Sequence, residues 1–170
     1  TTASSCTAIL SLFKNGAVDR VDAIHLSTAF TCMAKLKRTL TKENVASPTF
    51  LALLSRVDLF LGEWDRIVGF SQCVANLLWA VAALREEARV VQRLLPGLVE
   101  AVMAISQELK PVEASSSLWA VATLHAYVPK SRPTLRLAEL LPEQDHALVS
   151  WCRRVWKSSR RSGRSRNLQE

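Results

Sequence analysis

The sequence predicts an all-α fold, an α-solenoid of about four helix–turn–helix repeats with a disordered basic tail after it. The first observation is a near copy: residues 77–84 read Leu-Leu-Trp-Ala-Val-Ala-Ala-Leu, and residues 117–124 read Ser-Leu-Trp-Ala-Val-Ala-Thr-Leu, 40 positions later. Self-similarity at a period of about 20–50 residues is typical of stacked helical repeats. The second is composition, since 49% apolar residues with five glycines and six prolines suit an ordered helical chain. The third is periodicity, because apolar side chains recur at helical spacing and no stretch alternates as a strand would.

The repeat continues more weakly in both directions. Residues 29–36 align with 77–84 at an offset of 48, and residues 149–156 place Trp151 in register 32 positions after Trp119. Four repeat units result. The length of 170 residues suits one domain. We therefore expect residues 1–157 to form the helical-repeat domain and residues 158–170 to form a basic Arg/Ser-rich tail.

The first half of the chain carries clear helix-start signals. We expect a short helix over residues 5–13, and a second helix that Asp22 caps and that continues to residue 36. Ser47 and Pro48 are the N-cap and first residue of a third helix, whose apolar residues recur at helical spacing. These apolar residues are Leu51, Leu54, Val57 and Leu61.

The second half is more apolar. A fourth helix over residues 71–85 is apolar nearly all round, so neighbours must cover it on more than one side. The stripe over residues 88–109 is interrupted by Pro96 and Gly97, which predicts a kink or two helices. A partner helix over 112–124 and two helices over 135–141 and 143–157 complete the series.

Positive charge gathers at the end of the chain. The formal charge is +7, and residues 1–152 hold 15 basic and 14 acidic side chains. Residues 153–170 hold one acid, Glu170, and seven basic side chains. These are Arg153, Arg154, Lys157, Arg160, Arg161, Arg164 and Arg166.

Clustered arginines without acidic partners favour contact with a phosphate backbone. The alternative is a solvated basic terminus with no dedicated ligand. Lys35, Lys37 and Arg38 add a second candidate RNA contact in the last turn of the second helix, where they also complement the helix dipole.

Motifs for catalysis, metals and membranes do not occur in the sequence. It has no Gly-rich phosphate loop, no HExxH and no G-x-S-x-G. The four cysteines are far apart, which favours reduced buried thiols, and the three histidines do not cluster with them as zinc ligands. We therefore expect no enzyme activity, no cofactor, no metal and no small-molecule substrate. No apolar run is long enough for a membrane span, no signal peptide opens the chain, and the missing initiator methionine indicates a processed or truncated terminus.

The tryptophans divide into two groups. Trp79 and Trp119 lie in the most apolar stretches, which favours packing in the core over base stacking. Trp151 and Trp156 lie beside Arg153 and Arg154 and are better candidates for stacking. Trp64 lies between two acidic residues.

Residues 72–84, read as Q-C-V-A-N-L-L-W-A-V-A-A-L, resemble the second helix of the octotricopeptide repeat. The heptatricopeptide repeats of alveolate organelle proteins are similar, and residues 94–124 fit one whole unit of this kind. The resemblance implies an α-solenoid of mitochondria or plastids that binds RNA, processes transcripts or serves in an organellar ribosome. The chain departs from the pattern in its irregular spacing, and it has no RAP-domain segment, so no nuclease-like activity is carried over.

These observations lead to two functional hypotheses. The first is a non-catalytic, mitochondrial RNA-binding protein (a plastid is the alternative). We expect it to be a structural component of a mitochondrial ribosome that binds ribosomal RNA, or of an RNA-processing complex. Its partners would be RNA and other subunits of a large assembly. The second is a protein–protein scaffold subunit of an organellar membrane or multi-protein complex without direct RNA contact.

Overall fold

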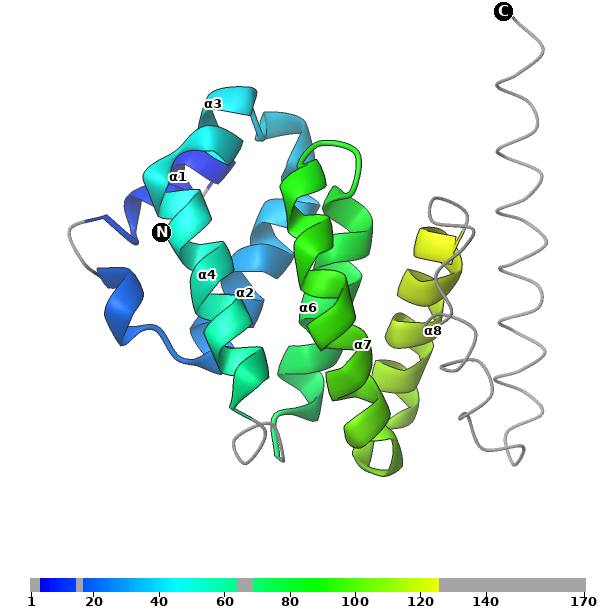
Figure 1. Ribbon diagram of the computed structural model, residues 1–170. Helices are drawn as coiled ribbons and strands as arrows, with labels where there is room; N and C mark the ends of the chain where they lie inside the picture. Colours follow the sequence, from blue (N-terminus) through cyan, green and yellow to red (C-terminus); the bar gives the residue numbers. More distant parts are fainter. Residues whose placement is uncertain (1–3, 15–16, 64–68, 126–170) are drawn as a thin grey trace, which may run out of the picture.

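The computed structural model describes residues 4–14, 17–63 and 69–125, and all regular secondary structure in these ranges is helical (Figure 1). The all-α prediction is confirmed for this part of the chain. The α-helices are α1 (Cys6–Ser11), α2 (Ala23–Lys35), α3 (Lys42–Ala46), α4 (Pro48–Gly62), α6 (Ser71–Leu84), α7 (Leu95–Ala104) and α8 (Pro111–His125). The 3-10 helices are η1 (Ala17–Arg20), η2 (Lys37–Thr39), η3 (Arg89–Leu94) and η4 (Ser106–Glu108).

The predicted helix starts coincide with side-chain caps. The Asp22 carboxylate accepts a hydrogen bond from the His25 backbone N–H at 2.8 Å and begins α2. Ser47 Oγ accepts from the Phe50 backbone N–H at 3.2 Å, with Pro48 in the first turn of α4. Each cap satisfies a backbone donor that the first helical turn leaves without a partner.

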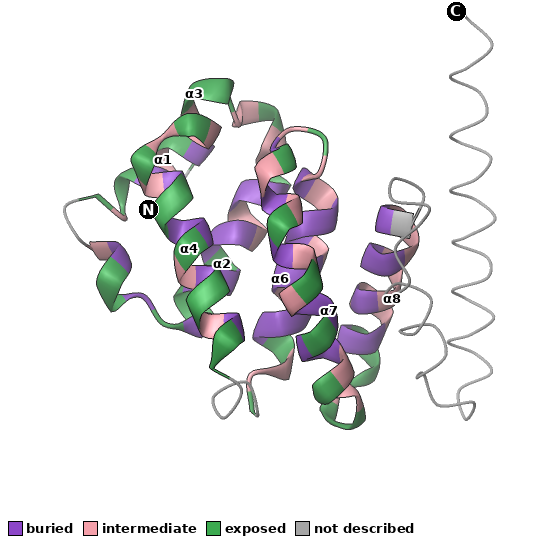
Figure 2. Ribbon diagram, viewed as in Figure 1, coloured by how far each residue is buried: buried purple, intermediate pink, exposed green. Residues whose placement is uncertain are grey.

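Helix α6 is the centre of the fold. It packs against α2 on one flank and α8 on the other, and α7 contacts it from the second layer. Figure 2 shows that burial is concentrated along α6 and the faces turned toward it. The buried residues of α6 are Cys73, Val74, Ala75, Leu77, Leu78, Ala80, Val81, Ala82 and Leu84. The prediction that this apolar helix is covered on more than one side is confirmed.

The helices form two layers of opposite direction. Lys37 Nζ, just after α2, donates to the Ala83 carbonyl at the end of α6, so α2 and α6 end side by side. The Gly69 N–H, just before α6, donates to Glu108 Oε2, just before α8, so these two helices begin side by side. Helices α2, α6 and α8 are therefore parallel, while α4 and α7 run the other way in the second layer (Figure 1).

The chain breaks at Pro96 as predicted. η3 ends at Leu94, and α7 begins at Leu95 with Pro96 in its first turn, where the missing N–H removes no helical hydrogen bond. Gly97 allows α7 to approach α4 closely, because a Cβ atom there would lie 3.3 Å from Leu61 Cδ1.

The structure differs from the sequence expectations in two places. Leu51 belongs to the predicted apolar stripe of α4 but is 39% exposed, and the inward-facing side is completed by Phe50 and Leu53. Trp79 and Trp119 pack against the core as predicted, but both are only half-buried and are not among its fully buried residues. The predicted helices over 135–141 and 143–157, the fourth repeat unit and the tail lie outside the described residues.

We expect Leu78→Ala to lower the free energy of unfolding by about 2–5 kcal/mol, because Leu78 is fully buried and its removal leaves a cavity. Leu59→Ala is the matched control, since Leu59 is 59% exposed on α4 and should change stability by about 0.5 kcal/mol or less. Urea unfolding followed by circular dichroism measures both. Equal effects would contradict the central place of α6.

We expect the Asp22 cap to make stability dependent on acid pH. The pKa of Asp22 is lowered, chiefly by the hydrogen bond from the His25 N–H. The stabilisation is therefore present above the ordinary aspartate pKa of about 3.9 and is lost as the pH falls through the lower native value. Asp22→Ala should cost about 0.5–2 kcal/mol at neutral pH, and less in acid.

Asp22→Asn is the control for this prediction, because it keeps an oxygen acceptor but carries no charge. Thermal unfolding of the three proteins between neutral pH and about pH 2 tests it. A stability difference between wild type and Asp22→Ala that stays constant over this range would disprove the ionised cap.

Candidate nucleic-acid interface

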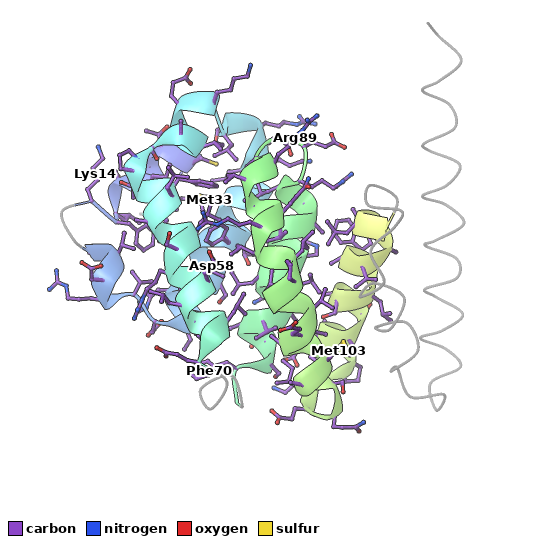
Figure 3. All side chains as sticks on the ribbon, viewed as in Figure 1. Lys14, Met33, Asp58, Phe70, Arg89 and Met103 are labelled. Atoms are coloured by element: carbon purple, nitrogen blue, oxygen red, sulfur yellow. The ribbon has the colours of Figure 1, made fainter. Side chains whose placement is uncertain are left out.

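The parallel direction of α2, α6 and α8 gives the described part of the chain two edges of opposite charge. We define the carboxyl edge as residues 35–47 and 85–89, which follow α2 and α6. We define the amino edge as residues 19–25, 63, 69–71 and 105–113, which precede or begin α2, α6 and α8, or follow α4. Figure 3 labels Arg89 at the first edge and Phe70 at the opposite one.

The charges on the two edges have opposite sign. The carboxyl edge has six basic and three acidic side chains, an excess of three positive charges. The amino edge has five acidic and two basic side chains, an excess of three negative charges. The basic side chains of the carboxyl edge are Lys35, Lys37, Arg38, Lys42, Arg85 and Arg89.

Three of the sequence-predicted RNA contacts lie together on the carboxyl edge. Lys35 is the last residue of α2 and is exposed, and Arg38 is exposed in η2. Neither forms an ion pair within the described residues. Their charges are therefore available to an anionic partner.

Lys37 is held differently. Its Nζ atom lies 3.0 Å from Glu87 Oε1 and 3.4 Å from the Ala83 carbonyl oxygen. Its side chain is 39% exposed and that of Glu87 is 27% exposed, so solvent screens the pair and its contribution is about 1 kcal/mol or less. Lys37 thus ties the ends of α2 and α6 together, and Glu87 balances its charge.

Two further basic residues of this edge were not singled out from the sequence. Lys42 and Arg89 are exposed and are the first residues of α3 and η3, the elements that follow η2 and α6 in the chain. The signal that would have found them is their closeness in sequence to residues 36 and 85, where the second and fourth predicted helices end. Arg85 is 18% exposed and donates to the Ala82 carbonyl at 2.7 Å, so it satisfies the end of α6.

The other predicted RNA contacts lie outside the described residues. The last described residue, His125, ends α8 on the same side as the ends of α2 and α6 (Figure 1). The undescribed contacts are Arg153, Arg154, Lys157, Arg160, Arg161, Arg164 and Arg166.

Groups for acid–base, thiol or metal chemistry are not assembled in the described ranges. His25 Nδ1 lies 2.7 Å from Asp22 Oδ1, but both side chains are more than half exposed and Asp22 serves as a helix cap. Burial raises the pKa of the Cys6 thiol, which donates to the Leu36 carbonyl at 3.4 Å. Among residues 4–14, 17–63 and 69–125, no three His, Cys, Asp or Glu side chains gather as metal ligands.

The described helices also include none with the length and apolar character needed to span a bilayer. Comparison with known protein families, with curated proteins and with solved structures finds no match to this chain.

Proposed function

We propose that this chain is a non-catalytic RNA-binding protein built as an α-solenoid, and that it works as a structural component of an organellar ribonucleoprotein. The observation that carries the proposal is the separation of charge between the two edges, together with the cationic sequence over residues 153–170. Phosphate groups would meet the carboxyl edge and the tail, because each neutralised phosphate releases condensed counterions.

The packing of the repeated segments supports the solenoid part of the proposal. Three aligned segments lie in α2, α6 and α8, which pack side by side in one layer, and the first segment extends one residue beyond α2. The segments are residues 29–36, 77–84 and 117–124. Solenoids stack such units so that each contacts its neighbours, and they present an extended surface to a partner.

The resemblance to octotricopeptide repeats supports the setting. It favours a mitochondrion, with a plastid as the alternative, and a place in a ribosome or RNA-processing complex beside other protein subunits. Ribosomal RNA is the partner that suits a short chain with a basic tail.

We expect the exposed charges of the carboxyl edge to set part of the salt dependence. The triple variant Lys35→Gln, Arg38→Gln, Lys42→Gln should weaken binding to single-stranded RNA. The slope of log affinity against log salt should fall by about 2, because each phosphate contact contributes about 0.7. Fluorescence anisotropy with a labelled oligonucleotide over a range of potassium chloride concentrations measures this slope.

The matched control changes charge on the opposite edge. Arg20 and Lys110 lie on the amino edge, and replacing both with Gln should leave the slope unchanged. An equal loss from the two sets of substitutions would show that net charge alone governs binding.

We expect residues 153–170 to contribute more of the salt dependence of RNA binding than the carboxyl edge does. Replacing the seven basic residues of positions 153–170 with Gln in the full chain should lower the salt slope by up to about 5 and remove most of the affinity. Helical content measured by circular dichroism should not change. Undiminished binding by this variant would refute the role of the tail.

A second candidate function is a protein–protein scaffold, which the exposed apolar side chains favour. Four large apolar side chains are each more than half exposed. They are Leu12 just after α1, Ile24 on α2, Leu59 on α4 and Val112 on α8. Purification without nuclease separates the two functions. Co-purified RNA supports the first, whereas a stoichiometric protein partner without RNA supports the second.

A further inference from the structure

One face of the α2–α6–α8 layer presents polar side chains and a pair of tryptophan rings that are not buried. In α6 beyond its first residue, Ser71, the residues that are not buried recur as one stripe at helical spacing, with α2, α7 and α8 covering the rest of the helix. This stripe consists of Gln72, Asn76, Trp79 and Ala83.

The sequence offsets of 48 and 40 locate the equivalent stripes on the two parallel neighbours. None of the residues in these stripes is buried. The α2 stripe consists of Ile24, Thr28, Thr31 and Lys35, and the α8 stripe consists of Val112, Ser116, Trp119 and Thr123. We name the three stripes together the outer face.

Equivalent residues of the outer face form rows across the three helices. One row is polar throughout, with Thr28, Asn76 and Ser116. The next row contains Trp79 and Trp119, whose ring centroids are 6.2 Å apart with an interplanar angle of 35°.

The stripes run along the helices toward the positively charged carboxyl edge. The stripe of α2 ends in the exposed Lys35, and Lys37 Nζ reaches the Ala83 carbonyl, one turn beyond Trp79. Toward the carboxyl edge, the outer face therefore carries polar groups on all three helices, then the aromatic rings of α6 and α8, and then the positive charge at the end of α2.

We propose that the Trp79–Trp119 pair is a stacking site for unpaired bases of single-stranded RNA. This inference rests on the proposed function and adds the part of the RNA that this surface recognises. Bases stack on half-exposed aromatic rings whatever their identity, while the phosphates follow a positively charged groove or edge. Here Lys35 and Arg38 lie on the phosphate side.

The Asn76 amide lies one turn from Trp79 on the other side. It makes no hydrogen bond within the described residues and is half-buried. An amide carries two donors and an acceptor, which suits the edge of a stacked base. In contrast, Ser116 Oγ already donates to the Val112 carbonyl at 3.0 Å, so the Asn76 amide is the stronger candidate for base contact.

The experiment compares a labelled oligouridylate with an abasic oligomer of the same length and charge, each titrated with the full chain. Wild type should bind the oligouridylate more tightly. Trp119→Leu should weaken this binding by roughly five- to a hundredfold and leave binding of the abasic oligomer unchanged. Trp119→Phe should restore most of the loss.

Asn76→Ala is the second variant, because it changes a half-buried polar group and leaves the tryptophan pair in place. It should weaken oligouridylate binding by about two- to tenfold, the range of one net hydrogen bond. Leu59→Ala on α4 is the matched control and should change neither affinity. Thermal unfolding of each variant identifies any loss that arises from misfolding.

The outcomes separate this inference from the proposed function. Equal affinity of wild type for both oligomers, with a steep salt dependence, overturns base stacking and leaves RNA binding through phosphates in place. Parallel losses on both oligomers in folded Trp119→Leu and Asn76→Ala also overturn it. A wild-type chain that binds neither oligomer overturns both proposals.

Discussion

The fold depends on α6 having neighbours on both flanks. Nine of its fourteen residues are buried, and they include residues on both sides of the helix as well as those facing the second layer. Since each fully buried leucine contributes about 1.5–3 kcal/mol, a helix of this kind is stable only between others. The positions of α2 and α8 follow from this need, and α4 and α7 close the second layer beneath them. The contacts of Lys37 with the Ala83 carbonyl and with Glu87 lie where the ends of α2 and α6 meet.

Much of this architecture was predictable because local chemistry determines it. Asp22 and Ser47 begin helices through contacts three residues away, and Pro96 lies in the first turn of α7, where its missing N–H removes no helical hydrogen bond. The repeat at residues 77–84 and 117–124 identified two helices that lie side by side. The features that the sequence did not predict depend on contacts between residues that are distant in the chain. The spacing of Leu51 is helical, but only the packing of α4 decides that Phe50 and Leu53 point inward in its place.

The candidate site was predictable in part for the same reason. The grouping of Lys35, Lys37 and Arg38 follows from their closeness in sequence, and all three lie on the carboxyl edge. The ion pair between Lys37 and Glu87 joins residues 50 positions apart, so no local sequence pattern predicts it. The tryptophans were assigned to the core because their segments are apolar. Their half-buried state arises because both lie on stripes that none of the described helices covers, and this follows from the packing of α6 against α8 and not from a local pattern.

The parallel direction of α2, α6 and α8 has a consequence for the field around the molecule. Their backbone dipoles leave partial negative charge at the carboxyl edge, and only α4 and α7 oppose them. The side chains carry the reverse sign, positive at the carboxyl edge and negative at the amino edge. The two dipoles therefore oppose each other, but one uncompensated helix carries only about half a charge at each end, so the side chains decide the sign of each edge. At longer range the opposite excesses of the two edges offset each other. Steering over distances beyond about 10 Å is left to the unbalanced charge of residues 153–170. The described helices then act at short range, where individual side chains determine which groups of a partner they contact.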